Sequence, residues 1–368
     1  MPQDPQPAES TVLPDGVRKP PHDTSLDLLK GILVLGMVAA HIVQFFPSGG
    51  SASAGFSNYI NLITFSGFMF VFGCTCSIAY LFKDISYPAL AKKLSRGFVR
   101  TLVAFYISGI AFTFFVAGEC TPASIIRILT LQYIPGYSEF LLSFAFIFPF
   151  LFAVKPLASR LNGLSCIILV ILSLLSCSLQ FDTSFLPALG VFIGGNTFFC
   201  FPILSYVSYF VVGAYLSKKK ESLNWMVLIA ACAGTLAFCM FAWQAQALPN
   251  RFPPSALWVM GGYLFVYAYW LACRKVKRWN IVRAAEAVGA KSLQYLVASN
   301  VSIFLSFWLL SQTGLSLGRT PLIAFWVMLF AACMAASFAC VKVGRWFKGA
   351  FRTWRIQMQG EDIPSKGM

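Results

Sequence analysis

The stretch that decides the fold is Leu28–Phe46, with the sequence LLKGILVLGMVAAHIVQFF. Apart from one lysine and one histidine it is almost entirely apolar, and as an α-helix it is long enough to cross the ~30 Å hydrocarbon core of a bilayer. Nine similar runs follow, at Tyr59–Phe82, Leu102–Ala117, Phe140–Ala158, Leu164–Leu179, Phe198–Ser217, Trp225–Trp243, Pro254–Cys273, Leu293–Leu310 and Leu322–Val341. The sequence therefore predicts an all-α integral membrane protein with about ten transmembrane helices.

Composition supports this class. Of 368 residues, 58% are hydrophobic and 11% charged, whereas an average globular chain is roughly a quarter charged. The mean hydropathy is +0.73. A soluble core of this size cannot bury so much apolar surface, so we expect the lipid bilayer to cover most of it.

The positive charge is arranged as membrane topology requires. Of 28 Lys and Arg residues, all but Arg127, Arg251 and Arg319 fall on one predicted side of the membrane. Because cytoplasmic loops hold most Lys and Arg, this predicts that both termini are cytoplasmic. The same arrangement explains the formal net charge of +15 without nucleic-acid binding.

The two ends of the chain differ from the spans. Residues 1–25 are polar and Pro-rich and are predicted to form a disordered cytoplasmic tail. Residues 26–341 form the predicted transmembrane domain. Residues 342–368 form a predicted basic amphipathic cytoplasmic tail, in which aromatic and basic residues interleave as in a helix lying on an anionic leaflet.

Lys30 and His41 share one face of the first predicted helix. Eleven residues separate them, which is three turns plus about 20°, or about 16 Å along the axis. An ionisable residue at the depth of His41 indicates a functional site, and a neutral imidazole acts as a general base near pH 7. The alternative is an interhelical hydrogen bond.

A basic cluster opens the third predicted helix. Lys93, Arg96 and Arg100 share one helical face, with Lys92 beside them. Such a cluster fits the phosphates of a nucleotide cofactor. The alternative is that it only reflects the positive-inside rule.

Several of these residues resemble the membrane acyltransferase 3 family and its relatives, the glucan succinyltransferase and heparan N-acetyltransferase types. The stretch Leu26–Ile32 continuing to His41 resembles the family's first helix, and Lys93-Leu-Ser-Arg96 resembles its basic pair. Phe210-Val-Val-Gly213 and Gly289-Ala-Lys-Ser292-Leu293 resemble two later motifs. The chain departs from the family at Ser299 and Asn300, where many members have a second histidine, and at Ala145, where many have a glutamate.

The resemblance implies an O-acyltransferase that moves an acyl group from cytoplasmic acyl-CoA to a hydroxyl of an extracytoplasmic glycan or lipid-linked sugar. Acetyl-CoA is the first expectation for the donor and succinyl-CoA the second, with no metal. His41 is the expected base, and Lys30, Lys93, Arg96 and Arg100 are expected to hold the CoA phosphates. The acceptor-side candidates are Glu139, Tyr295, Ser299 and Asn300, with Tyr137 nearby. The expected location is a bacterial inner membrane.

Another class of function stays open. A transporter or flippase for an anionic lipid-linked or small substrate would use the basic cluster as a vestibule and His41 for proton coupling. Against it stand the lack of internal repeats and the scarcity of carboxylates within the spans. A relative that has kept the fold and lost the chemistry is a further alternative.

Overall fold

The computed structural model describes residues 23–358 except 120, 180, 184, 196–197, 199, 221–222, 278 and 315–318. Every regular element in this part of the chain is a helix. Eight helical segments are long and apolar enough to cross a membrane: Thr24–Phe45, Ser51–Leu81, Tyr87–Phe115, Glu139–Arg160, Trp225–Ala245, Ala256–Lys275, Ser292–Thr313 and Leu322–Gly344. The predicted all-α class is confirmed for the described residues, and their long apolar helices fit the predicted multi-pass membrane protein.

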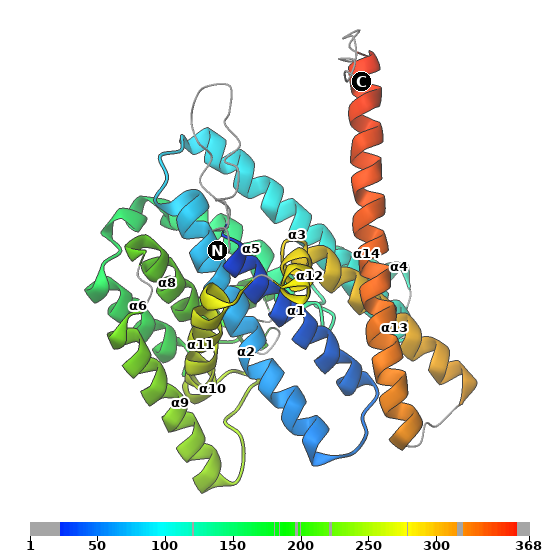
Figure 1. Ribbon diagram of the computed structural model, residues 1–368, viewed down its shortest axis with the longest axis horizontal. Coiled ribbons are helices and arrows are strands. Elements are labelled where there is room, and N and C mark those ends of the chain that lie inside the picture. The colour runs from blue at the N-terminus through cyan, green and yellow to red at the C-terminus, as the bar shows by residue number, and fades with distance from the viewer. Residues whose placement is uncertain are drawn as a thin grey trace, which may run out of the picture.

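The individual helices are arranged as one bundle (Figure 1). Their bounds are α1 Thr24–Phe45, α2 Ser51–Cys76, η1 Ser77–Leu81, α3 Tyr87–Phe115, α4 Pro122–Leu129, α5 Glu139–Val154, η2 Lys155–Arg160, α6 Gly163–Ser176, α7 Pro187–Ile193, α8 Ile203–Lys219, α9 Trp225–Ala245, α10 Ala256–Gly261, α11 Tyr263–Lys275, α12 Asn280–Gly289, α13 Ser292–Thr313 and α14 Arg319–Met358. Each predicted span falls on one of these helices or on a consecutive pair. Two of them, α6 and α8, have 14 and 17 residues, fewer than the ~20 of an ordinary span, so the count of ten stays a prediction.

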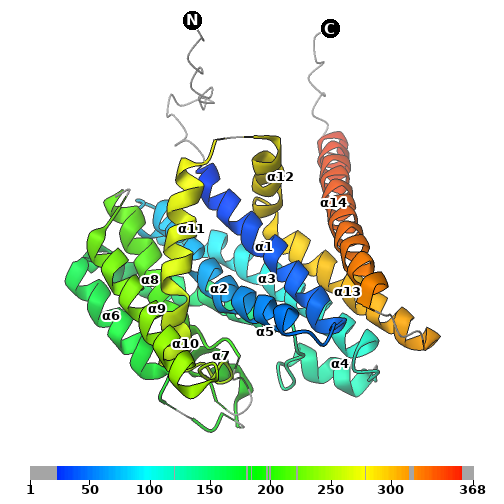
Figure 2. The ribbon, with the colours of Figure 1, turned by 60° about the horizontal axis from the view of Figure 1, so that its bottom comes forward.

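The bundle has two distinct ends. In Figure 2, α12, the start of α1 and the last turns of α14 lie at one end, which we call the α12 end. The short helices α4 and α7 lie at the opposite end. Both ends of the described chain thus lie on the same side of the bundle, as an even number of spans requires.

The structure moves two predicted domain boundaries. The first helix begins at Thr24, and its N-cap Asp23 accepts a hydrogen bond from the Ser25 amide at 3.0 Å. Residues 24 and 25, predicted to belong to the tail, are therefore helical. Residues 1–22 lie outside the described residues. At the other end, α14 is a single helix of 40 residues, about 60 Å long. It runs through the predicted boundary at residue 342 and extends past the bundle (Figure 1).

Glycines set the closest helix contacts. A Cβ at Gly73 of α2 would overlap the Phe210 carbonyl of α8, and one at Gly213 would overlap the Phe70 carbonyl. A Cβ at Gly289 of α12 would likewise overlap the Asp27 carbonyl of α1. The two later sequence motifs therefore lie at points where backbones touch, which only glycine permits.

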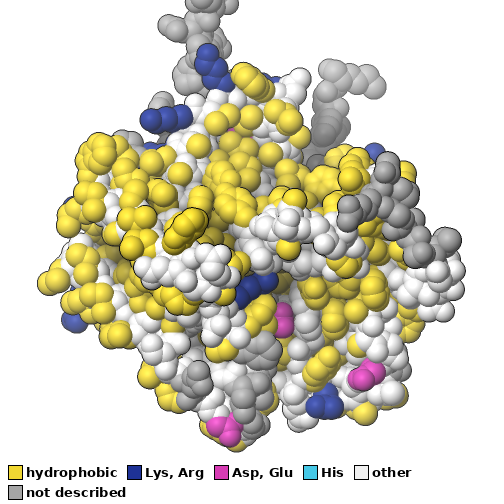
Figure 3. All heavy atoms as spheres, turned by 90° about the horizontal axis from the view of Figure 1, so that it is seen from below, with side chains coloured by type: hydrophobic (Ala, Val, Ile, Leu, Met, Phe, Trp, Pro, Cys, Tyr) yellow, Lys and Arg dark blue, Asp and Glu magenta, His cyan; other side chains and the backbone are white. Residues whose placement is uncertain are grey.

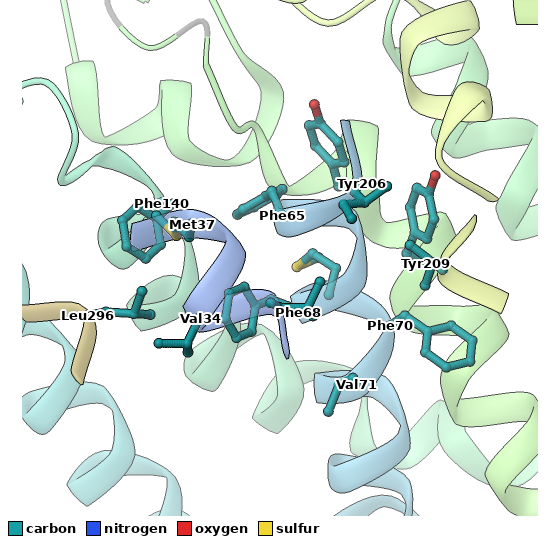
Figure 4. Packing of buried hydrophobic residues seen from close by; sticks show 14 of the residues in the cluster. Val34, Met37, Phe65, Phe68, Phe70, Val71, Phe140, Tyr206, Tyr209 and Leu296 are labelled. Carbon is teal, nitrogen blue, oxygen red and sulfur yellow. The ribbon is translucent and has the colours of Figure 1, made fainter. Parts of the chain in front are cut away.

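Large apolar side chains fill the space between helices and also cover the outside. Figure 4 shows Phe65 and Phe68 of α2 packed among residues of neighbouring helices, including Met37 and Tyr206. On the outside, Trp225 of α9 is 66% exposed, and many other apolar side chains of α6 and α9 are exposed as well. Such an apolar exterior fits contact with lipid.

Candidate functional site

His41 is buried near the end of α1 that lies away from α12, with 7% of its surface exposed. Its Nδ1 atom lies 3.1 Å from Oδ1 of Asn300 on α13. These residues are 259 positions apart in the chain. The structure thus brings together the predicted base and one of the predicted acceptor-side residues.

The surroundings of Asn300 determine how its amide is oriented. Its Nδ2 atom lies 3.2 Å from the Tyr137 carbonyl oxygen and 3.1 Å from the Ser108 hydroxyl. A carbonyl only accepts hydrogen bonds, so the atom facing it must be the NH2 group and Oδ1 must face His41. Therefore Nδ1 of the neutral imidazole donates to Oδ1, and the lone pair lies on Nε2.

Tyr137 contributes a ring as well as its carbonyl. The ring meets the His41 ring edge-on, with centroids 5.1 Å apart and an interplanar angle of 87°. Its backbone has a φ of 60°, in the left-handed region that bulky residues rarely adopt. Strained backbone of this kind is frequent at functional sites, where surrounding contacts hold it in place.

A cavity of about 230 Å³ adjoins His41. The cavity is lined by residues of α1, α2 and α5 and of the loops before α5, α8 and α10. Its polar lining residues include His41, Gln44, Asn61, Thr64, Glu139 and Arg251. Among the described residues, none is recorded as a hydrogen-bond partner of His41 Nε2, so the basic nitrogen is available to a ligand in this cavity.

A second hollow of about 780 Å³ shares Gln44, Asn61, Tyr137 and Arg251 with the His41 cavity. We call this hollow the vestibule. The loop between α1 and α2 and the first turns of α2 supply many of its other residues, including several serines. Figure 3, viewed from below, shows a hollow near the centre of this face with a basic and an acidic side chain close together.

Arg251 belongs to this site and was not among the residues predicted for it. It lies in the turn before α10, its guanidinium carbon is 4.3 Å from the centre of the Phe252 ring, and its Nε atom is buried without a hydrogen-bond partner among the described residues. Burial lowers the pKa of Arg251, but an arginine stays charged at any physiological pH. A signal was present in the sequence, because Arg251 is one of three basic residues on the side where Lys and Arg are scarce.

Glu139 also lines the cavity, at the first position of α5. Its Oε1 atom accepts a hydrogen bond from the Cys200 thiol at 3.3 Å. Arg251 and Glu139 thus contribute a cation and a carboxylate to one small space, although no ion pair between them is recorded in the described part of the chain.

The predicted cofactor residues lie away from this cavity. Lys30 is 22% exposed and forms a salt bridge with Asp27 at 2.5 Å. Lys93, Arg96 and Arg100 are exposed on α3. None of these four residues lines the His41 cavity, and α12 packs against α1 beside Lys30.

Two other acceptor-side candidates are buried elsewhere on α13. The Ser299 hydroxyl donates to the Leu296 carbonyl of its own helix at 3.0 Å, and Tyr295 lies five residues before Asn300, toward the α12 end. Neither residue lines the cavity. Of the predicted residues, His41, Tyr137, Glu139 and Asn300 therefore gather here.

No protein-family model matches the chain, and neither a curated protein nor a solved structure matches it significantly. Among the described residues, no three His, Cys, Asp or Glu side chains are grouped so that they could share a metal ion.

Proposed function

We propose that this protein is an acyl-CoA-dependent O-acyltransferase of the membrane, with His41 as its general base. The observation that carries the proposal is the hydrogen-bonded chain from the Tyr137 carbonyl through Asn300 to His41, which leaves Nε2 basic beside a cavity. A base held by an amide in one tautomer is an arrangement that acyl-transfer enzymes use.

The proposed reaction needs one proton carrier. Nε2 of His41 removes the proton of an acceptor hydroxyl as its oxygen attacks the thioester carbonyl carbon. A C–O bond forms, the C–S bond breaks, and the imidazolium returns its proton to the leaving CoA sulfur. The amides and hydroxyls of the vestibule suit an acceptor rich in hydroxyl groups, such as a glycan or a lipid-linked sugar.

The proposed topology has ten transmembrane helices and both termini in the cytoplasm. The vestibule then opens on the extracytoplasmic side, and acyl-CoA approaches from the α12 end, where Lys30, Lys93, Arg96 and Arg100 hold its phosphates. An acetyl donor, with succinyl as the alternative, and a bacterial inner membrane rest on the resemblance to the acyltransferase 3 family.

The decisive experiment measures release of CoA and transfer of radiolabelled acetyl by the full chain in lipid nanodiscs. We expect His41→Ala to lower turnover by ~10²- to 10⁴-fold, the usual cost of losing a general base, with the melting temperature retained. His22→Ala, in the N-terminal tail, is the control and should have no effect. Normal turnover in the His41→Ala protein would exclude His41 as the base.

A second experiment tests the donor side and separates this proposal from a transporter. Neutralising Lys30, Lys93 or Arg96 should weaken acyl-CoA binding by ~10- to 100-fold, since each charge-assisted contact is worth about 1.5–3 kcal/mol. Binding of a short thioester without the nucleotide should not change.

Lys219→Gln is the matched control, because Lys219 is exposed in another predicted cytoplasmic loop. Its neighbour Lys218 is unsuitable, since it donates to the carbonyls of Ser159 and Leu161 at 3.2 and 2.6 Å. Unchanged CoA affinity in all the variants, together with uptake of an anionic substrate by proteoliposomes, would favour the transporter.

A further inference from the structure

Arg251 contributes to both hollows of the candidate site. Its side chain lines both the vestibule and the His41 cavity, so it lies at their junction. We propose that Arg251 binds an anionic group of the acceptor, a carboxylate or a phosphate, and so orients a nearby hydroxyl toward His41. This inference rests on the proposed function and specifies its substrate class as an acidic carbohydrate.

The first argument concerns unsatisfied charge. The Nε–H of Arg251 is buried and has no hydrogen-bond partner among the described residues. A buried donor without a partner is costly, and a cation more so. A ligand that supplies an anion removes this cost when it binds, and the forked guanidinium fits the two oxygens of a carboxylate or phosphate.

The second argument concerns rigidity. The guanidinium lies over the Phe252 ring, and the turn that carries it is closed by a hydrogen bond from the Ser255 amide to the Asn250 carbonyl at 2.9 Å. A side chain supported in this way loses little conformational entropy when it binds an anion.

The third argument concerns the neighbouring carboxylate. Glu139 lines the same cavity, and its charge and that of Arg251 act on one another. In the described part of the chain, however, no salt bridge joins the two side chains, and Glu139 Oε1 accepts a hydrogen bond from the Cys200 thiol. Among the described residues, the buried Nε–H of Arg251 therefore stays unpaired and available to an anionic group of the substrate.

Neutral polar side chains near Arg251 could bind the hydroxyl groups of the proposed acidic sugar. Gln44 donates to the Ser57 hydroxyl at 2.7 Å, and Asn61 lies 3.4 Å from the same oxygen. These neutral groups line the vestibule beside Arg251. They suit the hydroxyls of a sugar ring, which form hydrogen bonds with amides and carry no charge.

The test is a binding measurement that does not depend on acyl transfer. The full chain in nanodiscs is titrated calorimetrically with glucuronic acid, glucose 6-phosphate and neutral glucose. We expect at least one of the acidic sugars to bind more tightly than glucose. Arg251→Gln should lower the affinity for that sugar by ~10- to 100-fold and leave glucose unchanged. The two acidic sugars show whether the group is a carboxylate or a phosphate.

The matched control is Arg127→Gln. Arg127 is another arginine of the same predicted side, but it is exposed on α4 and absent from the lining of the cavity and vestibule. Arg127→Gln should therefore bind the acidic sugars as the unaltered protein does. Arg251→Lys keeps the positive charge but loses the forked guanidinium, so it should retain part of the affinity for the acidic sugar. This variant replaces Arg251→Gln in the test if Arg251→Gln does not fold.

Equal affinity of the unaltered protein for acidic and neutral sugars would overturn the inference, as would an Arg251→Gln protein that binds both normally. If Arg251→Gln lowers the stability of the protein, Glu139→Gln is added to it. A double variant that regains stability and still binds acidic sugars would show that Arg251 and Glu139 form a structural charge pair and that Arg251 is not an anion site. Arg251-dependent binding without acetyl transfer would support the anion site and remove the acyltransferase proposal. Acetyl transfer to neutral sugars that is equal in the unaltered and the Arg251→Gln proteins would support the acyltransferase proposal and overturn the anion site.

Discussion

At the scale of single residues, the Asn300 amide decides which nitrogen of His41 is basic. The Tyr137 carbonyl holds the NH2 group, so the amide oxygen is left for Nδ1. This amide adjoins the single histidine of the described residues. An amide cannot take up the proton, so in the proposed reaction Asn300 would only orient His41.

Asn300→Ala should lower acetyl transfer by roughly 10- to 100-fold, the usual cost of removing a group that orients a functional histidine. Lost orientation should reduce kcat more than it raises the KM for acyl-CoA. The control is Ser299→Ala on the same helix, because among the described residues that hydroxyl donates to a carbonyl of α13 itself. This variant should retain activity. A normal kcat in Asn300→Ala would show that the hydrogen bond is structural.

At the scale of elements, glycine decides which helices come into contact. The contact of α2 with α8 depends on Gly73 and Gly213, and the contact of α1 with α12 depends on Gly31 and Gly289. The second contact packs α12 against the half of α1 that carries Lys30. Lysines secure other helix ends, since Lys155 donates to the Tyr80 and Leu81 carbonyls at 2.8 Å.

Gly73→Ala should destabilise the protein by ~1–3 kcal/mol, because the added methyl group overlaps the Phe210 carbonyl and overpacks a helix contact. Gly55→Ala in the same helix is the control. A Cβ there meets nothing within 4 Å, and alanine favours a helix by about 0.5–1 kcal/mol. Thermal unfolding in detergent compares the two, and equal melting temperatures would contradict the close contact.

At the scale of the whole molecule, the two proposed substrate-binding regions lie toward opposite ends of the bundle. The vestibule includes the loop that follows α1, whereas Lys30 lies near the start of α1, about 16 Å from His41 along the helix axis. An acyl donor entering at the α12 end and an acceptor entering through the vestibule would therefore meet at His41. This separation suits transfer of a group across a membrane.

The proposed topology places the first turn of α2 and the last turn of α8 on opposite sides of the membrane. In intact cells an impermeant maleimide should label Ala52→Cys, whereas Lys219→Cys should react only after the membrane is permeabilised. Both positions are exposed, and the unaltered protein provides the background labelling of its own cysteines. Labelling of Lys219→Cys in intact cells would reverse the topology.

The sequence by itself determined the membrane class and the positions of the longer apolar helices, and it marked His41 as a candidate site residue. These follow from local properties: an apolar run of sufficient length enters the bilayer whatever its neighbours are, and an imidazole within such a run is conspicuous. The charge asymmetry is likewise a sum over loops and needs no contacts.

Only the tertiary structure decided which side chains meet. His41 and Asn300 are 259 residues apart, and Arg251 joins them from a third part of the chain. The structure also showed that Ser299, next to Asn300, faces away from the cavity, and that the basic cluster does not line it. Which side chains meet depends on how the helices rotate and pack against one another. The glycine contacts that set this packing join segments that are distant in the sequence.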